Sequence, residues 1–207
     1  EREDAARGAE ESLAVARRAD DAEGMSHALA LLGQIAQASG AIAQADERFT
    51  ESLAQARRCN TPHVLTAALG NSAQTAQARG NLSLALALLN ETLTIARQSG
   101  SLWGEALTQT HLGLLEFTLS HFDEARGHYT EALALYRRMG SDVYLAWCLE
   151  GVAALDVAEG YYARAVAISA GADSLRAGER APRPAGEQQA FERTLVAARA
   201  ALGEQAY

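Results

Sequence analysis

FDEARGHYTEALALYRRMGS, the stretch from Phe122 to Ser141, decides the fold, because parts of it recur elsewhere in the chain. Its segment EALALYRRMG begins at Glu131. Related segments begin at intervals of forty residues: ESLAVARRAD at Glu11, ESLAQARRCN at Glu51 and ETLTIARQSG at Glu91. No insertion interrupts this spacing. A fixed period of this length indicates a repeat protein, in which each unit stacks on its neighbours.

Each forty-residue block is predicted to form two helices. Residues that favour turns recur at two places in every block: Asp20, Asn60, Gly100 and Gly140, and Gly40, Gly80, Ser120 and Gly160. Between them, apolar residues follow steps of three and four, as helices require. Small residues also recur in phase, at Gly33, Ala73, Gly113 and Ala153 and at Ala45, Ala85, Ala125 and Ala165. We expect these small residues to let the paired helices approach closely.

The third block resembles the tetratricopeptide-repeat (TPR) signature through the spacing of Leu112, Gly113, Ala125, Tyr129 and Ala132. The other blocks match through Leu32, Gly33, Ala45 and Phe49, and more weakly through Ala73 with Ala85 and Ala153 with Ala165. The resemblance implies an all-α, right-handed α–α superhelix of about ten helices, with a lead helix and four helical hairpins over residues 1–178. The period exceeds the usual 34 residues, and the usual proline at the repeat end is missing.

The stretch after the fourth block reads differently. RAGERAPRPAGEQ holds Pro182 and Pro184, so we expect the preceding helix to end near Leu175. Residues 179–207 are predicted to form a Pro/Gly linker and a capping helix from about Glu187 to Leu202. Phe191 begins the apolar stripe of this helix, which would cover the last exposed face of the repeats.

Residues 167–207 resemble the end of the repeat region in large bacterial LuxR-type regulators and related multi-domain ATPases. This resemblance implies the sensor or interaction part of a transcriptional regulator, between a nucleotide-binding domain and a DNA-binding helix-turn-helix. The chain begins without methionine, in the middle of the repeat pattern, so we expect a fragment of a longer protein. The alternative is a freestanding adaptor that binds peptides. The lack of lysine suggests GC-rich codons and a bacterial source.

Composition narrows the function classes. All 18 basic residues are arginine, which excludes a P-loop lysine and a Schiff-base lysine. The net charge of −8 argues against direct contact with nucleic acid or an anionic membrane. Cys59 and Cys148 form no CxxC motif, so we expect two free thiols and a cytoplasmic protein. No apolar run approaches the ~20 residues of a membrane span.

Motifs for catalysis or metal binding are weak. His121 and His128 are seven residues apart, not at the i, i+4 spacing of a helical zinc pair, so we expect neither metal nor cofactor. Glu116, Glu150 and Asp156 could in principle act as an acid and a base. Carboxylates are common on any acidic solenoid, however, and we expect no enzyme activity.

The predicted binding surface is the concave face, which in the TPR family is lined by the first helix of each pair. The inward positions implied by this resemblance are His27, Gln34, Gln37, Gln74, Gln77, Leu107, Thr110, Leu114, Phe117, Trp147, Glu150 and Val157. The first two repeats thus offer amides, and the last two offer apolar side chains. Such a groove suits a protein or peptide partner, or a small effector.

Three alternatives stay open at this point. The C-terminal helix could cover the apolar half of the groove and make Trp147 and Phe117 ordinary core residues. The first helix could expose Ala5, Leu13 and Ala16 and join two copies in a homodimer. The paired arginines that end the second helices, such as 57–58, could bind acidic partners, or could simply complement the helix dipole.

Overall fold

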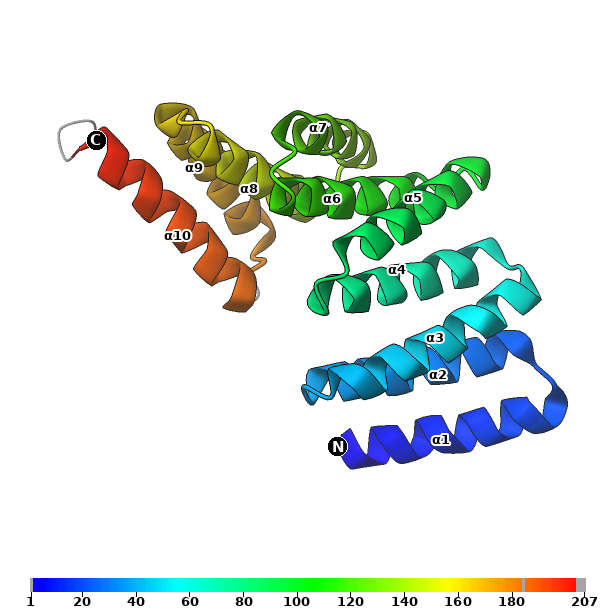
Figure 1. The fold of residues 1–207 in the computed structure, drawn as a ribbon. Helices are drawn as coiled ribbons and strands as arrows, with labels where there is room; N and C mark the ends of the chain where they lie inside the picture. The colour runs from blue at the N-terminus through cyan, green and yellow to red at the C-terminus, as the bar shows by residue number, and fades with distance from the viewer. Residues whose placement is uncertain (1, 184, 204–207) are drawn as a thin grey trace. The chain divides into compact units, whose positions relative to one another are not determined.

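The computed structural model describes residues 2–183 and 185–203, and every secondary-structure element within them is helical. The ten helices (Figure 1) are α1 (Arg2–Ala19), α2 (Ala22–Ala38), α3 (Ile42–Cys59), α4 (Pro62–Ala78), α5 (Leu82–Gln98), α6 (Leu102–Thr118), α7 (Phe122–Met139), α8 (Asp142–Ala158), α9 (Tyr162–Glu179) and α10 (Ala185–Leu202). The prediction of an all-α chain with about ten helices is confirmed. None of the helices in the described residues is long and apolar enough to span a bilayer.

The predicted turn residues end the helices. Asn60 and Gly140 lie in the left-handed region, with φ of 51° and 67°, and they cap α3 and α7. The end predicted for α9 is wrong by four residues, because this helix continues to Glu179 before Arg180 turns left-handed. A proline excludes helical geometry mainly at the residue just before it, so Pro182 does not affect Leu175.

Small residues bring paired helices together, as the sequence predicts. A Cβ atom on Gly33 would lie 2.5 Å from the Phe49 ring, and one on Gly113 would lie 3.0 Å from the Tyr129 ring. Tyr129 also faces Gly151 of the following pair, where an added Cβ would meet the ring at 2.4 Å. Tyr129 therefore fills the space between α6, α7 and α8, and its ring leaves no room for a side chain at Gly151 and little at Gly113.

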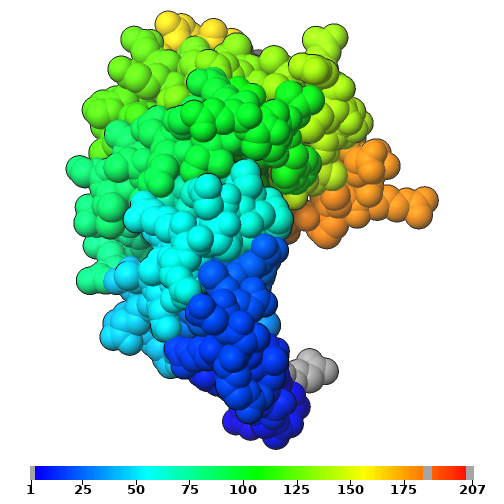
Figure 2. All heavy atoms as spheres, turned by 90° about the vertical axis from the view of Figure 1, so that its right-hand side faces the viewer, coloured from blue at the N-terminus to red at the C-terminus, as the bar shows by residue number. Residues whose placement is uncertain are grey.

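Contacts divide the chain into two compact units, Glu1–Gly104 and Glu105–Tyr207, which are described separately. In the first unit α1 packs on α2, and Figure 2 shows the side chains of α1 to α3 (blue to cyan) closing the gaps between these helices. Leu13 and Ala16 are buried in this contact with Leu29. The prediction that Leu13 and Ala16 form an open face is therefore wrong, because α2 covers them; Ala5 alone of the three is exposed.

Exposed ion pairs connect successive repeats of the first unit. The Arg17 guanidinium lies 2.8 Å from Glu51, and that of Arg57 lies 3.0 Å from Glu91. Two of the glutamates that begin repeated segments, Glu51 and Glu91, thus receive an arginine from the repeat before them. Arg17 and Arg57 therefore do more than complement the helix dipole, and their guanidinium groups are already paired within the chain.

The second unit comprises most of α6 together with α7 to α10. Its core gathers Tyr136, Cys148 and Leu155 with Tyr129. Helix α10 lies along α8 and α9 and buries Phe191 and Ala198 (Figure 1). Both cysteines of the chain are free thiols, as predicted.

Candidate binding cavity in the C-terminal unit

A cavity of about 550 Å³ lies between α6, α8 and α10 of the second unit. Its lining combines residues from these three helices with one ring from α7: Thr110, Leu114, Phe117, Tyr129, Trp147, Glu150, Gly151, Ala154, Val157, Ala158, Ala190, Phe191, Arg193, Thr194 and Ala197. The lining is mostly apolar, with a few polar groups. Cavities of this size and character hold small molecules or the anchoring side chains of a partner.

Half of the twelve predicted groove residues meet in this cavity. These six are Thr110, Leu114, Phe117, Trp147, Glu150 and Val157. Leu107 is half-buried and lies outside the lining. The other five positions, all polar, belong to the first unit, where His27, Gln34 and Gln74 are exposed and Gln37 and Gln77 are half-buried. The structure therefore brings together four of the five predicted apolar positions, with Thr110 and Glu150 beside them.

Aromatic contacts hold the α8 wall in place. The Trp147 ring packs edge-on against His111 at 5.4 Å and against Tyr144 at 6.2 Å between ring centroids. Burial lowers the pKa of His111, so this imidazole is neutral near pH 7 and supports the Trp147 ring as an uncharged neighbour. Phe117 packs beside Phe122, with 5.9 Å between ring centroids. The wall is preformed, which reduces the entropic cost of binding.

Helix α10 closes one side of the cavity. Its Phe191 ring is buried, and the Arg183 guanidinium lies 3.6 Å from the ring centroid. The two alternatives for the apolar surface thus prove compatible, because α10 covers part of it and leaves an accessible space beside Trp147. The apolar stripe of this helix predicts that Phe191 packs against the repeats. It did not indicate that Arg193 and Thr194, on the flank of the same helix, would line a cavity.

A buried ion-pair network lies at the edge of the cavity. Glu150 receives the Arg176 guanidinium at 2.6 Å and the Arg183 guanidinium at 2.8 Å. The three side chains are only 9%, 7% and 8% exposed, so the network is shielded from solvent screening. Glu150 was predicted as a groove contact, but its oxygens already bind α9 and the linker. Its role is to connect α8 to the segment that leads into α10.

The contacts of the other two carboxylates oppose the acid–base hypothesis. Glu116 pairs with His121 at 2.8 Å. Asp156 accepts hydrogen bonds from Arg164 at 2.6 Å and Arg126 at 2.9 Å. Burial alone would raise the pKa of Asp156, but these arginines lower it overall, whereas a general acid needs a pKa near the working pH.

Cys148 is an unsuitable nucleophile. Its thiol is buried, lies 3.1 Å from the Thr110 hydroxyl, and has its pKa raised to about 12 by burial. A thiol with such a pKa carries almost no thiolate at neutral pH. Cys148 therefore serves as a small apolar core residue.

Comparison with known proteins identifies the fold of the chain. The family model described as "Tetratricopeptide repeat" matches residues 64–138. The crystal structure of BtubC (BKLC) from P. vanneervenii is similar with a TM-score of 0.80 and 23% identity, over 98% of this chain and 85% of that one. The chain has a TPR-like solenoid fold.

Two further solved structures share this TPR-like fold. A putative kinesin light chain from Podosopora anserina, with nearly identical TPR-like repeats, gives a TM-score of 0.70 at 15% identity and covers 87% of this chain and 89% of that chain. The apo form of RapI gives 0.68 at 14% identity over 91% of this chain and 55% of that one. No curated protein matches the chain. The resemblance to the TPR signature is thus confirmed as a fold, whereas the resemblance to LuxR-type regulators stays a prediction.

Proposed function

We propose that this chain is a non-catalytic recognition module whose binding site is the cavity between α6, α8 and α10. The proposal rests on the cavity itself. Its volume of about 550 Å³ and its mostly apolar walls suit an apolar ligand group or side chain. TPR-like folds bury their repeat contacts and leave the inward positions free to vary. Here those positions are apolar only in the second unit.

The polar groups of the cavity define the ligand more closely. Thr110 donates its hydroxyl hydrogen to the Ala106 carbonyl and lies against the Cys148 thiol, and Thr194 donates to the Ala190 carbonyl, so neither hydroxyl has a hydrogen left to donate to a ligand. Glu150 is occupied by its arginines. Arg193 is exposed, and among the described residues the structure records no hydrogen bond or ion pair for it. The ligand that fits is an apolar body carrying an acidic group, either a small effector or an acidic amphipathic peptide.

A panel of aryl and medium-chain carboxylic acids, each with its neutral amide, tests this assignment by calorimetry. We expect the acids to bind more tightly than the amides, and Arg193→Gln to remove the difference. The double variant Phe117→Ala, Trp147→Ala should bind neither class. The matched control Gln34→Ala, Gln74→Ala changes inward positions of the first unit and should bind normally. Unchanged binding of the acids by the double cavity variant would contradict the proposal.

For the biological setting, we propose the sensor part of a cytoplasmic, multi-domain bacterial transcriptional regulator in signal transduction. A ligand that prefers one position of α10 would bias that helix, and any domain attached beyond it would receive the bias. The support for this setting is the resemblance of residues 167–207. A freestanding peptide-binding adaptor is the alternative. Coding sequence on both sides of this segment distinguishes them: a nucleotide-binding domain before it and a helix-turn-helix after it support the regulator, whereas start and stop codons at its ends exclude it.

The homodimer stays a prediction, but the surface of α1 that could form it differs from the one the sequence indicated. Because α2 covers Leu13 and Ala16, a dimer through α1 would have to use its exposed side, where Val15 is 56% exposed. A molecular mass that stays monomeric at every concentration would exclude it.

A further inference from the structure

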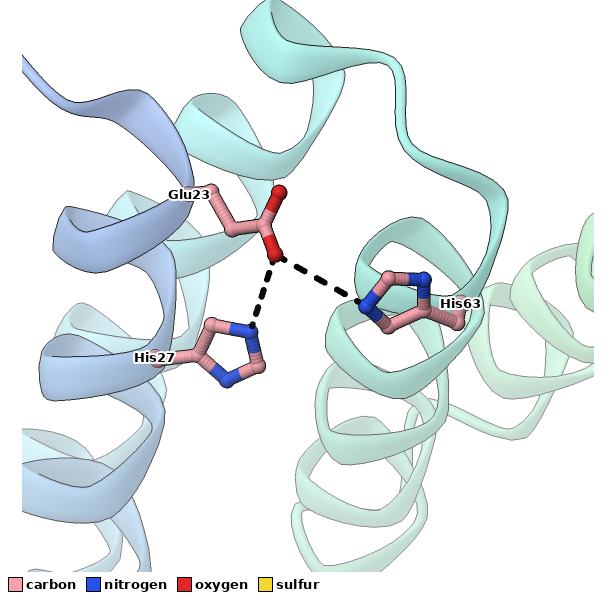
Figure 3. Close-up of side chains that lie close together, drawn as sticks. All are labelled: Glu23, His27 and His63. Atoms are coloured by element: carbon pink, nitrogen blue, oxygen red, sulfur yellow. Dashed lines mark ion pairs between the residues drawn. The ribbon is translucent and has the colours of Figure 1, made fainter.

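Two helices of the first unit bring two histidines and a glutamate to one point. The Nε2 atom of His27 lies 3.9 Å from Oε1 of Glu23, and the Nε2 atom of His63 lies 3.7 Å from the same oxygen. One ligand atom from each residue lies within 4.8 Å of the other two. Figure 3 shows both rings turning a nitrogen toward this carboxylate oxygen.

The forty-residue repeat explains why these side chains meet. Residues 23 and 63 occupy the same position in consecutive repeats, in the first turns of α2 and α4, and these two helices are in contact. His27 lies one helical turn after Glu23 and so shares its face. The spacing of histidines along a single helix predicts no metal site, because this cluster forms only between repeats.

The backbone and a neighbouring hydroxyl hold the cluster in position. Thr61, which precedes α4, donates to Oε2 of Glu23 at 3.3 Å and leaves Oε1 directed at the two histidines. The Asp21 carboxylate caps α2 by accepting from the Gly24 amide at 3.0 Å. Pro62 starts α4 with a fixed φ. An oxygen held by a second residue is typical of the outer shell around a metal ligand.

The distances suit an ion better than direct hydrogen bonds. Neither imidazole is close enough to Oε1 for a hydrogen bond, which requires about 3.2 Å or less. Ligands about 2.0–2.1 Å from a tetrahedral zinc ion lie roughly 3.3–3.5 Å apart. The two histidine–glutamate separations of 3.9 and 3.7 Å need to contract by only a few tenths of an ångström, and the two imidazole nitrogens, which lie within 4.8 Å of each other, by at most about 1.4 Å. Rotation of exposed side chains can provide both movements.

We propose that Glu23, His27 and His63 bind a divalent transition-metal ion of the zinc class. Two imidazole nitrogens and one carboxylate oxygen match the ligands of zinc, cobalt and nickel, whereas magnesium and calcium prefer oxygen alone. The side chains of Glu23, His27 and His63 are 45%, 59% and 71% exposed, so water completes the coordination and the ion exchanges freely. Bound metal connects α2 to α4 and stabilises the contact between the first two repeats.

Calorimetric titration of the tag-free chain with zinc, and visible spectra with cobalt, test the site. We expect one ion per chain with micromolar affinity. Glu23→Gln, His27→Ala and His63→Ala should each weaken binding at least about tenfold. The matched control is His121→Ala, which removes an exposed histidine paired with the carboxylate of Glu116 but lacking a second histidine. This control should leave affinity and stoichiometry unchanged.

Thermal unfolding provides a second, independent reading. Saturating zinc should raise the melting temperature of the wild type by mass action, EDTA should reverse the increase, and His63→Ala should lose it while keeping its helical circular dichroism. Two results would overturn the proposal. One is the lack of saturable binding below millimolar zinc. The other is binding that His63→Ala leaves unchanged, since the ion would then not bridge the helices.

Discussion

The two units use the same repeat to build different surfaces. Both pack their helices through small residues, with Gly33 beside Phe49 in the first unit and Gly113 beside Tyr129 in the second. The first unit connects its repeats by exposed ion pairs and presents glutamines at its inward positions. The second holds a buried ion-pair network around Glu150 and surrounds a cavity with mostly apolar side chains. The positions that define the repeat therefore determine packing, and the inward positions can change independently and determine function.

The largest effect on stability is expected from breaking the buried ion pairs of the second unit, because the two units differ most in the burial of their ion pairs. Glu150→Gln removes the buried carboxylate that Arg176 and Arg183 share, and it leaves Arg183 paired with Asp173, which is 52% exposed. We expect a loss of about 3 kcal/mol in the free energy of unfolding, measured with urea. A loss below about 0.5 kcal/mol would show that solvent reaches the network and that the two units do not differ in this respect.

The next effect tests the shared packing. Gly151→Ala places a Cβ atom against the buried Tyr129 ring, 2.4 Å from its nearest atom, and should cost about 2 kcal/mol through overpacking. The matched control is Gly127→Ala, where the added atom meets nothing within 4 Å. It should gain about 0.5–1 kcal/mol from helix propensity alone. If both variants gain stability, Tyr129 does not need the small residue.

A smaller effect depends on pH. Arginines lower the pKa of Asp156, so its stabilising contribution is complete above the usual aspartate pKa of about 4 and is lost as the pH falls through the lowered value. Because Arg164 is half exposed, we expect about 1 kcal/mol. The difference in unfolding free energy between wild type and Asp156→Asn should be constant from pH 5 to 7 and decrease below about pH 4. A difference that grows on acidification would contradict this assignment.

The smallest effect concerns the exposed pairs of the first unit. Arg57→Gln removes one contact between repeats, and its pair with Glu91 is 54% and 40% exposed. We expect a loss of less than about 0.5 kcal/mol at low salt, and none in 1 M sodium chloride. An effect as large as that of Glu150→Gln would remove the contrast between exposed and buried pairs.

The sequence predicted the repeat well and the site only in part. Periodic turns and small residues allowed all ten helices and the close helix contacts to be predicted, because these features depend on local pattern. The inward apolar positions, such as Phe117 and Trp147, were predicted through the resemblance to the TPR signature. The contribution of Arg193 and the pairing of Glu150 with two arginines were not, because they depend on how the linker and α10 return onto α8. The cluster of Glu23 with His63 depends likewise on the stacking of two repeats.

The most direct test of the central claim uses the two tryptophans, which lie in different units. Trp103 belongs to the first unit and Trp147 lines the cavity of the second, and each contributes one indole N–H signal in a ¹⁵N-labelled sample. The Trp103→Phe variant loses one of the two indole signals and so assigns both. Titration with a library of apolar carboxylic-acid fragments should move the Trp147 signal in a saturable way and leave that of Trp103 in place. Fragments that shift both signals equally, or only that of Trp103, would contradict a recognition site in the second unit.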